Sequence, residues 1–403
     1  MKALTWQGTH KVEVREVPDP SIEQPNDAVV RVTSTAICGS DLHLYSVLGP
    51  YLTPGDVLGH EFMGIVEEVG PQAGDLRVGD RVVVPFNISC GACYMCRIGR
   101  QSQCETTQVR EQGKGAALFG YTMLYGAVPG GQAEYVRVPQ AQYGPIKLPT
   151  HGADERYLYL SDILPTAWQA AKYADVQQDS TVAVFGLGPV GQFATRSALQ
   201  QGAGRVIGVD LVGERLEMAR SFGVETLDLR EVDDPAEAVK ELTNGRGADC
   251  VIEAVGMEAH GSPIAEAAIS ATALLPKAVA RKATEKVGID RLAALHACFE
   301  AVRRGGTVSV VGVYGGAADP MNMMTMFDKN LTIRMGQANV RNWTDALLAL
   351  VEQDGDVLGT ESLATHHLPL SDGPEAYGIF QKKHDGCIKV VLTPGDARPT
   401  DKV

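Results

Sequence analysis

The feature that most constrains this chain is a group of four cysteines within fifteen residues, Cys90-x2-Cys93-x2-Cys96-x7-Cys104. Four thiolates on one short lobe can complete a tetrahedral shell around Zn²⁺, and a shell with no open position is structural. An iron–sulfur cluster is the alternative, because four cysteines also hold one. We expect a zinc-stabilised lobe over residues 88–106.

The chain contains eight cysteines, an even number that is also compatible with disulfides. Disulfides belong to oxidising compartments, however, and residues 1–6 (MKALTW) lack the apolar segment of a secretory signal. No apolar run reaches the roughly 18 residues that span a bilayer. We therefore expect a cytoplasmic, metal-binding protein with no membrane partner.

Length and charge narrow the possible architectures and partners. A chain of 403 residues is too long for one compact core, so two domains are expected. The formal charge of −13 argues against nucleic acid as a partner, because a duplex attracts basic groups that replace its counterions. A small-molecule ligand remains the simplest expectation.

The hydrophobic pattern changes near residue 160. The first 150 residues predict short strands separated by glycine and proline, at 12–17, 28–32, 63–69 and 80–84. Strands then alternate with helices, which predicts a parallel sheet of an α/β fold. The strands are expected at 181–185, 206–209, 249–253 and 307–311, and the helices at 190–201 and 213–222.

This pattern predicts a nucleotide-binding domain over residues 165–313, inserted into a β-rich domain made of residues 1–164 and 314–403. The alanine-rich stretch 257–300 is long for a single connection. We expect it to form an additional helix or a lid over a ligand.

A second set of metal-binding residue types precedes the cysteine lobe. Cys38 lies in the sequence ICGSDLH, and His60 with Glu61 lies in GHEF. Each motif alone is weak, because isolated cysteines and histidines are usually structural. Together they offer a thiolate and an imidazole to Zn²⁺, and a shell with an open position makes the metal a Lewis acid.

The sequence Gly186-Leu187-Gly188-Pro189-Val190-Gly191 follows a predicted strand and opens a predicted helix. In this context the glycines let the backbone approach a pyrophosphate at the positive helix end. Asp210 ends the next strand, where a carboxylate can accept ribose hydroxyls and repel the extra phosphate of NADP. We expect NAD, while Arg215, either an adenine partner or a solvated residue, leaves tolerance of NADP open.

The order of these motifs resembles the zinc-containing medium-chain alcohol dehydrogenase family over nearly the whole chain. The resemblance implies a GroES-like, β-rich catalytic domain around a Rossmann-fold coenzyme domain, and two zinc ions per chain. Cys38 and His60 would bind the catalytic zinc, and the four-cysteine lobe the structural one. The resemblance also implies a homo-oligomer, a dimer or tetramer formed through the Rossmann edge.

The third catalytic ligand departs from the Cys₂His shell known for alcohol dehydrogenase. The corresponding segment, 160–168, has no cysteine, and Asp162 occupies the ligand position. An aspartate here resembles the formaldehyde dehydrogenase and dismutase branch. The alternative is that Asp162 caps the following helix. Glu61 is expected either to approach the metal or to be a buried ion-pair partner.

Proton handling and the remaining coenzyme contacts also follow from the resemblance. Ser40 would hydrogen-bond the substrate oxygen and His43 would pass the proton outward; otherwise Ser40 is a helix cap and His43 a surface residue. The coenzyme would be lined by further residues that could also be plain core or surface positions: Val255, His260, Val313, Gly336, Gln337, Ala338 and Lys389. His260 opens the long 257–300 segment, which would cover the adenine and retain NAD tightly.

Substrate identity is the least constrained expectation. The pocket should involve Ser40, Trp168, residues near 314 and the aromatic segment 110–125. The branch implies formaldehyde or another small aldehyde or alcohol, with no clear basic pair for the carboxylates of glutathione. The alternatives are a polyol or amino-alcohol dehydrogenase on the same scaffold, or an NAD-binding protein without activity.

Overall fold

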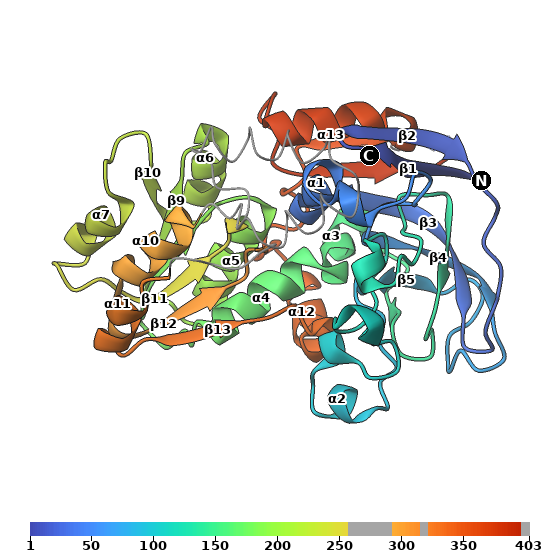
Figure 1. The fold of residues 1–403 in the computed structure, drawn as a ribbon, viewed down its shortest axis with the longest axis horizontal. Coiled ribbons are helices and arrows are strands. Elements are labelled where there is room, and N and C mark those ends of the chain that lie inside the picture. The colour runs from blue at the N-terminus through green and yellow to red at the C-terminus, as the bar shows by residue number, and fades with distance from the viewer. Residues whose placement is uncertain (257–291, 315–320, 396–403) are drawn as a thin grey trace. The chain divides into compact units, whose positions relative to one another are not determined.

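A computed structural model describes residues 1–256, 292–314 and 321–395 (Figure 1). The chain divides into two compact units: unit 1 is Met1–Pro165 with Ala338–Val403, and unit 2 is Thr166–Gln337. The first boundary lies one residue from the one expected from the sequence. The expected lid, 257–300, falls largely outside the described residues, and so does His260.

Unit 1 is built on a seven-stranded sheet with the order β14-β15-β3-β4-β5-β7, and β6 also pairs with β3. β14 and β15 are parallel, and the other neighbours are antiparallel. The strands are β3 (Ala28–Ile37), β4 (Glu61–Val69), β5 (Arg81–Val84), β6 (Tyr135–Val138), β7 (Ile146–Lys147), β14 (His366–Pro369) and β15 (Val390–Thr393). A separate hairpin pairs β1 (Lys2–Gly8) with β2 (Lys11–Glu16).

The register of three neighbouring strands, β15, β3 and β4, brings distant parts of the sequence together where these strands end or begin. Ala36 at the end of β3 is opposite Glu61 at the start of β4. Ile37 is opposite Val390 at the start of β15. Because β3 is antiparallel to both neighbours, the residues that follow β3 and those that open β4 and β15 meet at the same place.

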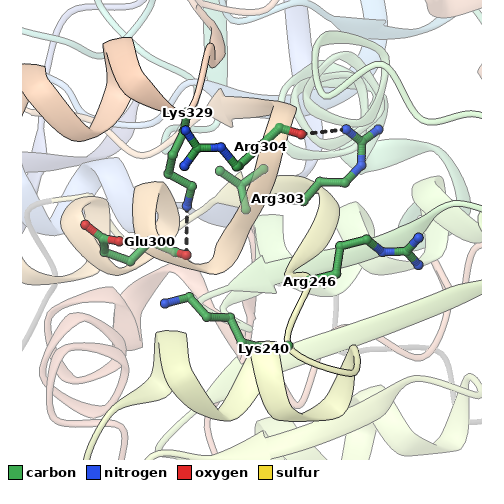
Figure 2. Close-up of a pocket in the computed structure, with 8 residues that line it drawn as sticks. Lys240, Arg246, Glu300, Arg303, Arg304 and Lys329 are labelled. Carbon is green, nitrogen blue, oxygen red and sulfur yellow. Dashed lines mark hydrogen bonds between the residues drawn. The ribbon is translucent and has the colours of Figure 1, made fainter.

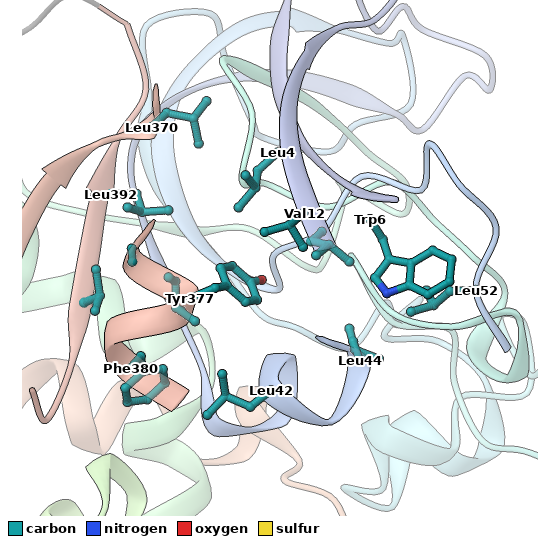
Figure 3. Close-up of a cluster of buried hydrophobic side chains, with 14 of the residues drawn as sticks. Leu4, Trp6, Val12, Leu42, Leu44, Leu52, Leu370, Tyr377, Phe380 and Leu392 are labelled. Carbon is teal, nitrogen blue, oxygen red and sulfur yellow. The ribbon is translucent and has the colours of Figure 1, made fainter. Parts of the chain in front are cut away.

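The helix that follows β3 is held by a hydrophobic core. α1 (Gly39–Ser46) contributes Leu42 and Leu44, which are buried with Tyr377 and Phe380 of α13 (Gly373–Lys382) and with apolar side chains of the β1–β2 hairpin. Figure 3 shows Tyr377 lying between the strands and α1. Burial of each such side chain contributes roughly 1.5–3 kcal/mol, so the start of α1 is firmly placed.

Unit 1 otherwise contains short helices. They are α2 (Tyr94–Arg97), α3 (Asp154–Leu158), α12 (Thr344–Val351) and the 3₁₀ turns η1 (Gly49–Tyr51), η2 (Gln101–Gln103), η3 (Arg110–Gln112), η4 (Met123–Tyr125), η5 (Tyr159–Ser161), η7 (Val340–Asn342) and η8 (Leu370–Asp372). Another helix, α4 (Ile163–Tyr173), begins at the end of the first segment of unit 1 and continues into unit 2.

Unit 2 contains a fully parallel six-stranded sheet with the order β10-β9-β8-β11-β12-β13. This is the doubly wound α/β arrangement that strand–helix alternation predicts. Its strands are β8 (Thr181–Phe185), β9 (Arg205–Asp210), β10 (Glu225–Asp228), β11 (Ala248–Glu253), β12 (Val302–Val310) and β13 (Thr332–Met335). The helices among its described residues are α5 (Pro189–Gln200), α6 (Gly213–Ser221), α7 (Pro235–Leu242), α10 (Ala293–Ala301) and α11 (Met323–Asp328).

The second boundary between the units lies at 337/338, later than the 313/314 expected from the sequence. α11 and β13 belong to unit 2, because β13 adds a sixth strand by pairing with β12, Ile333 opposite Val308. All four residues of β13 are exposed, so this strand lacks the apolar run that marks the buried strands of the same sheet. Among the described residues, no helix is long and apolar enough to cross a membrane.

Candidate active site

The place in unit 1 where the ends of β3, β4 and β15 meet carries a buried cluster of metal-ligand types. Cys38, His60, Glu61 and Asp162 each offer one ligand atom, and these atoms lie within 4.8 Å of one another. Cys38 follows β3, His60 and Glu61 open β4, and Asp162 follows η5. From the sequence, Cys38, His60 and Glu61 are expected to be neighbours only because of the order of their motifs. The strand register provides the physical reason why they meet.

Asp162 directs its carboxylate into this cluster. Its Oδ2 atom lies 3.5 Å from the Sγ of Cys38 and 3.3 Å from the Nε2 of His60. The backbone leading to it is anchored to the strand region, since the carbonyl of Ser161 accepts a hydrogen bond from the Phe86 amide. This direction favours the metal-ligand interpretation of Asp162 over the helix-cap alternative.

The imidazole of His60 is oriented from both sides. Nε2 faces the cluster and lies 3.1 Å from the hydroxyl of Ser40. Nδ1 lies 3.2 Å from Oδ1 of Asp41. A carboxylate behind a metal-binding histidine sets its tautomer and raises its basicity.

Asp41 is not among the site residues that the sequence predicts. In the structure it is fully buried, and its Oδ2 accepts hydrogen bonds from the Cys38 amide at 2.9 Å and from the Gln132 side chain at 3.3 Å. It therefore ties two ligand-bearing segments together. Its spacing of three residues after Cys38, typical of a capping box, was the available signal.

Electrostatics make this donor set unfavourable without a cation. Burial first, and then the charges of Glu61 and Asp162, raise the pKa of the Cys38 thiol to about 12. Burial alone would lower the pKa of His60, but Asp41, Asp162 and Cys38 outweigh it and hold that pKa well above its usual value. A bound divalent cation would compensate the clustered negative charge and allow the thiolate form. One sulfur, one nitrogen and one carboxylate oxygen are all ligands that zinc accepts.

Glu61 is engaged by a buried lysine. The ammonium of Lys389 donates to both carboxylate oxygens of Glu61, at 2.9 and 2.7 Å, and to the carbonyl of Ile37 at 2.9 Å. Both side chains are fully buried. Of the two roles expected for Glu61, this arrangement favours the ion-pair partner beside the metal cluster.

The same contacts correct the expected role of Lys389. The resemblance predicts it as a residue that lines the coenzyme, whereas in the structure it lies immediately before β15 and its ammonium is directed at Glu61 and Ile37. Its three hydrogen bonds satisfy all the donors of an ammonium group. It is a counter-ion of Glu61 and presents no free donor to a phosphate.

Aromatic side chains border the cluster within unit 1. The rings of Phe86 and Tyr121 each form a T-shaped contact with His60 at a centroid distance of 6.3 Å, and Tyr125 packs on Tyr121 at 5.6 Å. Phe119, in contrast, is a core residue that packs on Phe62. Tyr121 and Tyr125 of the aromatic 110–125 segment therefore lie beside the metal cluster.

The four-cysteine lobe forms as a second, separate cluster. Its sulfur atoms also lie within 4.8 Å of one another. Amides of Ala92 and Cys93 donate to the Cys90 sulfur, the hydroxyl of Thr106 donates to the same atom at 3.1 Å, and the Cys96 amide donates to that of Cys93. Burial raises the pKa of Cys90, but the bonds from Thr106 and the amides outweigh it and bring the pKa to about 6. Such donors stabilise thiolates, as a closed zinc shell requires.

In unit 2 the glycine turn lies at the carboxyl end of β8. Gly186 has φ +87°, and a side chain there would meet the backbone of Ala254. A Cβ on Gly191 would lie 1.8 Å from the carbonyl oxygen of Gly186. These positions admit only glycine. At Gly188, the N-cap of α5, a Cβ would have its nearest neighbour 3.8 Å away, which leaves room for a ligand at the helix start.

Asp210 ends β9 beside this turn. Its Oδ1 accepts the amides of Leu211 and Val212, and its Oδ2 accepts the amide of Leu187 at 2.6 Å. Arg215 lies 3.7 Å from Oδ2. Each carboxylate oxygen can accept two hydrogen bonds, so Oδ2 keeps capacity for a ribose hydroxyl.

The other expected coenzyme contacts fall into two groups. Val255 and Val313 follow β11 and β12, at the same edge of the sheet as the glycine turn. The carbonyls of Gly336 and Gln337 accept bonds from Gln169. Ala338 belongs to unit 1, where it is buried and its carbonyl binds Asn87.

Comparison with known proteins resolves the family. Residues 24–149 match the family described as alcohol dehydrogenase GroES-like domain, and residues 189–262 match zinc-binding dehydrogenase. An uncharacterised zinc-type alcohol dehydrogenase-like protein of Bacillus subtilis is 41% identical over 98% of this chain and 100% of its own length. The chain belongs to the zinc-type, medium-chain alcohol dehydrogenase family.

Two further relatives of this chain carry more specific names. A glutathione-independent formaldehyde dehydrogenase of Pseudomonas aeruginosa is 34% identical over 94% of both chains. The solved alcohol dehydrogenase of Thermus sp. ATN1 superposes with a TM-score of 0.81, at 36% identity, covering 98% of this chain and all of the other. The predicted fold, a GroES-like domain with a Rossmann-like parallel-sheet domain, is confirmed. Family membership implies an oxidoreductase that uses zinc and a nicotinamide coenzyme.

If the four-cysteine lobe binds its own zinc ion, a substitution in the lobe should remove that ion and leave the other cluster unchanged. Cys104→Ser should lose one zinc equivalent and lower the free energy of unfolding by more than about 2 kcal/mol, because metal binding supplies the stability of such lobes. Elemental analysis and urea unfolding measure both. Cys250→Ala is the control, since Cys250 is a buried cysteine of unit 2 outside either cluster. An unchanged zinc content in Cys104→Ser would contradict the assignment.

Proposed function

We propose that this protein is an NAD-linked dehydrogenase that oxidises a small alcohol or hydrated aldehyde of formaldehyde size. The observation that carries the proposal is the convergence of Cys38, His60 and Asp162, with Ser40 beside them. When bound, Zn²⁺ would supply a Lewis acid for the substrate oxygen, and the nicotinamide would accept the hydride. One zinc in each cluster makes two per chain.

The chain's own side chains would handle the proton. Oxidation of an alcohol carbon releases a hydride and the hydroxyl proton, so a group near the substrate oxygen must accept that proton. The Ser40 hydroxyl lies next to the metal cluster and can accept a hydrogen bond from the substrate. His43 lies three residues further along α1 and would take the proton onward, although its side chain is buried and not on the surface.

The substrate would be small because aromatic rings border the cluster. Phe86 and Tyr121 form T-shaped ring contacts with His60 and make this side of the cluster predominantly apolar. The similarity to a glutathione-independent formaldehyde dehydrogenase supports the same choice without a glutathione carrier. Trp168, also expected at the substrate, is a buried residue of unit 2. An NAD-reduction screen of formaldehyde, short alcohols and polyols, with and without glutathione, tests this choice.

Removal of one ligand should separate catalysis from the other properties. Cys38→Ala should lower kcat/KM by about three orders of magnitude or more, because the Lewis acid contributes several kcal/mol. Zinc in the four-cysteine lobe and NAD binding should remain. The matched control is Cys387→Ala, a buried cysteine of the α1–α13 core in the same unit. Turnover close to wild type in Cys38→Ala would overturn the metal assignment.

Asp210 should set the preference for NAD. Asp210→Ala removes an acceptor for the ribose hydroxyls, which contributes about 1.5–3 kcal/mol, and it also removes the repulsion of a 2′-phosphate. The KM for NAD should rise about tenfold or more, and the ratio of NAD to NADP efficiency should fall. Asp228→Asn, at the register position opposite Asp210 on β10, is the control. An unchanged coenzyme preference would show that the Asp210 carboxylate does not contact the coenzyme ribose.

We further propose a homo-oligomer formed through the β13 edge of unit 2. Ile333 and Met335 are exposed on this edge strand, and Met323, Met324 and Phe327 of the preceding helix α11 are exposed as well. An exposed edge with large apolar side chains is typical of an interface. Light scattering should show a smaller particle for Ile333→Lys/Met335→Lys than for wild type, and no change for Val78→Lys, which is exposed in unit 1. A wild-type monomer would contradict the proposal.

A further inference from the structure

A basic cavity lies in unit 2 at the amino ends of the parallel strands, whereas the glycine turn lies at their carboxyl ends. It has a volume of about 580 Å³, within the range of small-molecule sites. Its lining comes from the end of α7, the turn before β11, the end of α10, the first residues of β12 and the end of α11. β8, β11 and β12 are parallel, so the amino ends of β11 and β12 lie on the edge away from the Gly186–Gly191 turn.

The charge of this cavity contrasts with that of the whole chain. Five of its eight lining residues are cationic and one is acidic, in a protein with a formal charge of −13. They are Lys240, Arg246, Arg303, Arg304 and Lys329, with Glu300 as the acid. In Figure 2 the charged groups of Lys240, Lys329 and Arg304 lie on the left of the view, and those of Arg246 and Arg303 lie on the right. Cations gathered in a concave surface produce a local positive potential that concentrates anions.

Three of the five cations have structural partners. Arg303 binds Asp249 at 2.7 Å and Arg304 binds Asp328 at 2.8 Å. Lys329 donates to the carbonyls of Phe299 and Glu300, which end α10. These contacts leave further donor capacity on both guanidinium groups.

The remaining two cations are less engaged. Lys240 is 3.3 Å from Glu237 on its own helix. In the described part of the chain, the Arg246 guanidinium has no hydrogen bond or ion pair within bonding distance. Gly245 between them has φ +79°, and a Cβ there would meet nothing within 4 Å, so the cavity is open at this turn.

Neighbouring cations and burial together disfavour the charged form of Lys329. Burial is the largest cause that lowers the pKa of its ammonium, and the charges of Lys240 and Arg304 lower it further, while Glu300 opposes them. The basic side chains are therefore close enough to destabilise one another. A bound anion would relieve that repulsion.

We propose that this cavity binds a small anion that carries two or more linked phosphoryl groups. Guanidinium forks match the geometry of phosphate oxygens, and lysines add point charges. Three of the cations already have carboxylate partners, but the donors that remain are spread over several side chains. Two linked phosphoryl groups offer oxygens to more of these donors than one phosphoryl group does. The cavity has the volume of a small-molecule site, and the acidic chain repels nucleic acid as a whole, so a small molecule is the occupant.

Inorganic pyrophosphate is the probe for this site. Calorimetric titration would use the full-length, zinc-loaded protein saturated with NAD, at constant ionic strength, so that the coenzyme site is occupied. Wild type should bind pyrophosphate, and Lys240→Gln/Arg246→Gln should weaken binding about tenfold or more. Lys11→Gln/Arg220→Gln removes the same charge outside the cavity and should change affinity less than twofold. NADH binding verifies that each variant is folded.

Two comparison ligands test whether the cavity recognises linked phosphoryl groups, a nucleoside that carries them, or negative charge alone. ATP carries linked phosphoryl groups on a nucleoside and should lose affinity in the same variant, in parallel with pyrophosphate. Citrate carries comparable charge without phosphorus and should bind more weakly. Absence of pyrophosphate binding at millimolar concentration, equal affinity for citrate, or unchanged affinity in Lys240→Gln/Arg246→Gln would each overturn the proposal.

Discussion

A thiol, an imidazole and two carboxylates buried within 4.8 Å of one another are the constraint on which the rest of unit 1 depends. Burying such groups costs several kcal/mol unless charge is compensated. Glu61 has its compensation in Lys389, which is buried against it. Cys38, His60 and Asp162 are left as a set that a divalent cation would neutralise, and this division of charge separates the metal-binding atoms from the ion pair beside them.

The fold holds this set through backbone register. The end of β3 and the starts of β4 and β15 meet because β3 is antiparallel to both. Asp41 adds a tie across the start of α1, and the core of Leu42, Leu44 and Tyr377 keeps that helix in place. A site built on sheet ends and a packed helix has the rigidity that precise ligand geometry requires.

The sequence predicts local structure and motif chemistry well, because these depend on nearby residues. The strand 181–185, the glycine turn and the four-cysteine lobe all lie where periodicity and spacing place them. Long-range partners could not be predicted in this way. Lys389 meets Glu61 across 328 residues of chain, and the exposed strand β13 carries no apolar run, so neither its place in the sheet nor the later unit boundary was visible beforehand.

The most direct measurement is an anomalous difference map from crystals of the purified protein, collected on both sides of the zinc absorption edge. The account predicts two peaks per chain. One should lie among the sulfurs of the four-cysteine lobe, and the other should be bound by Cys38, His60 and a carboxylate oxygen of Asp162. A single peak in the lobe, or a second peak with Asp162 turned away from it, would contradict the central claim.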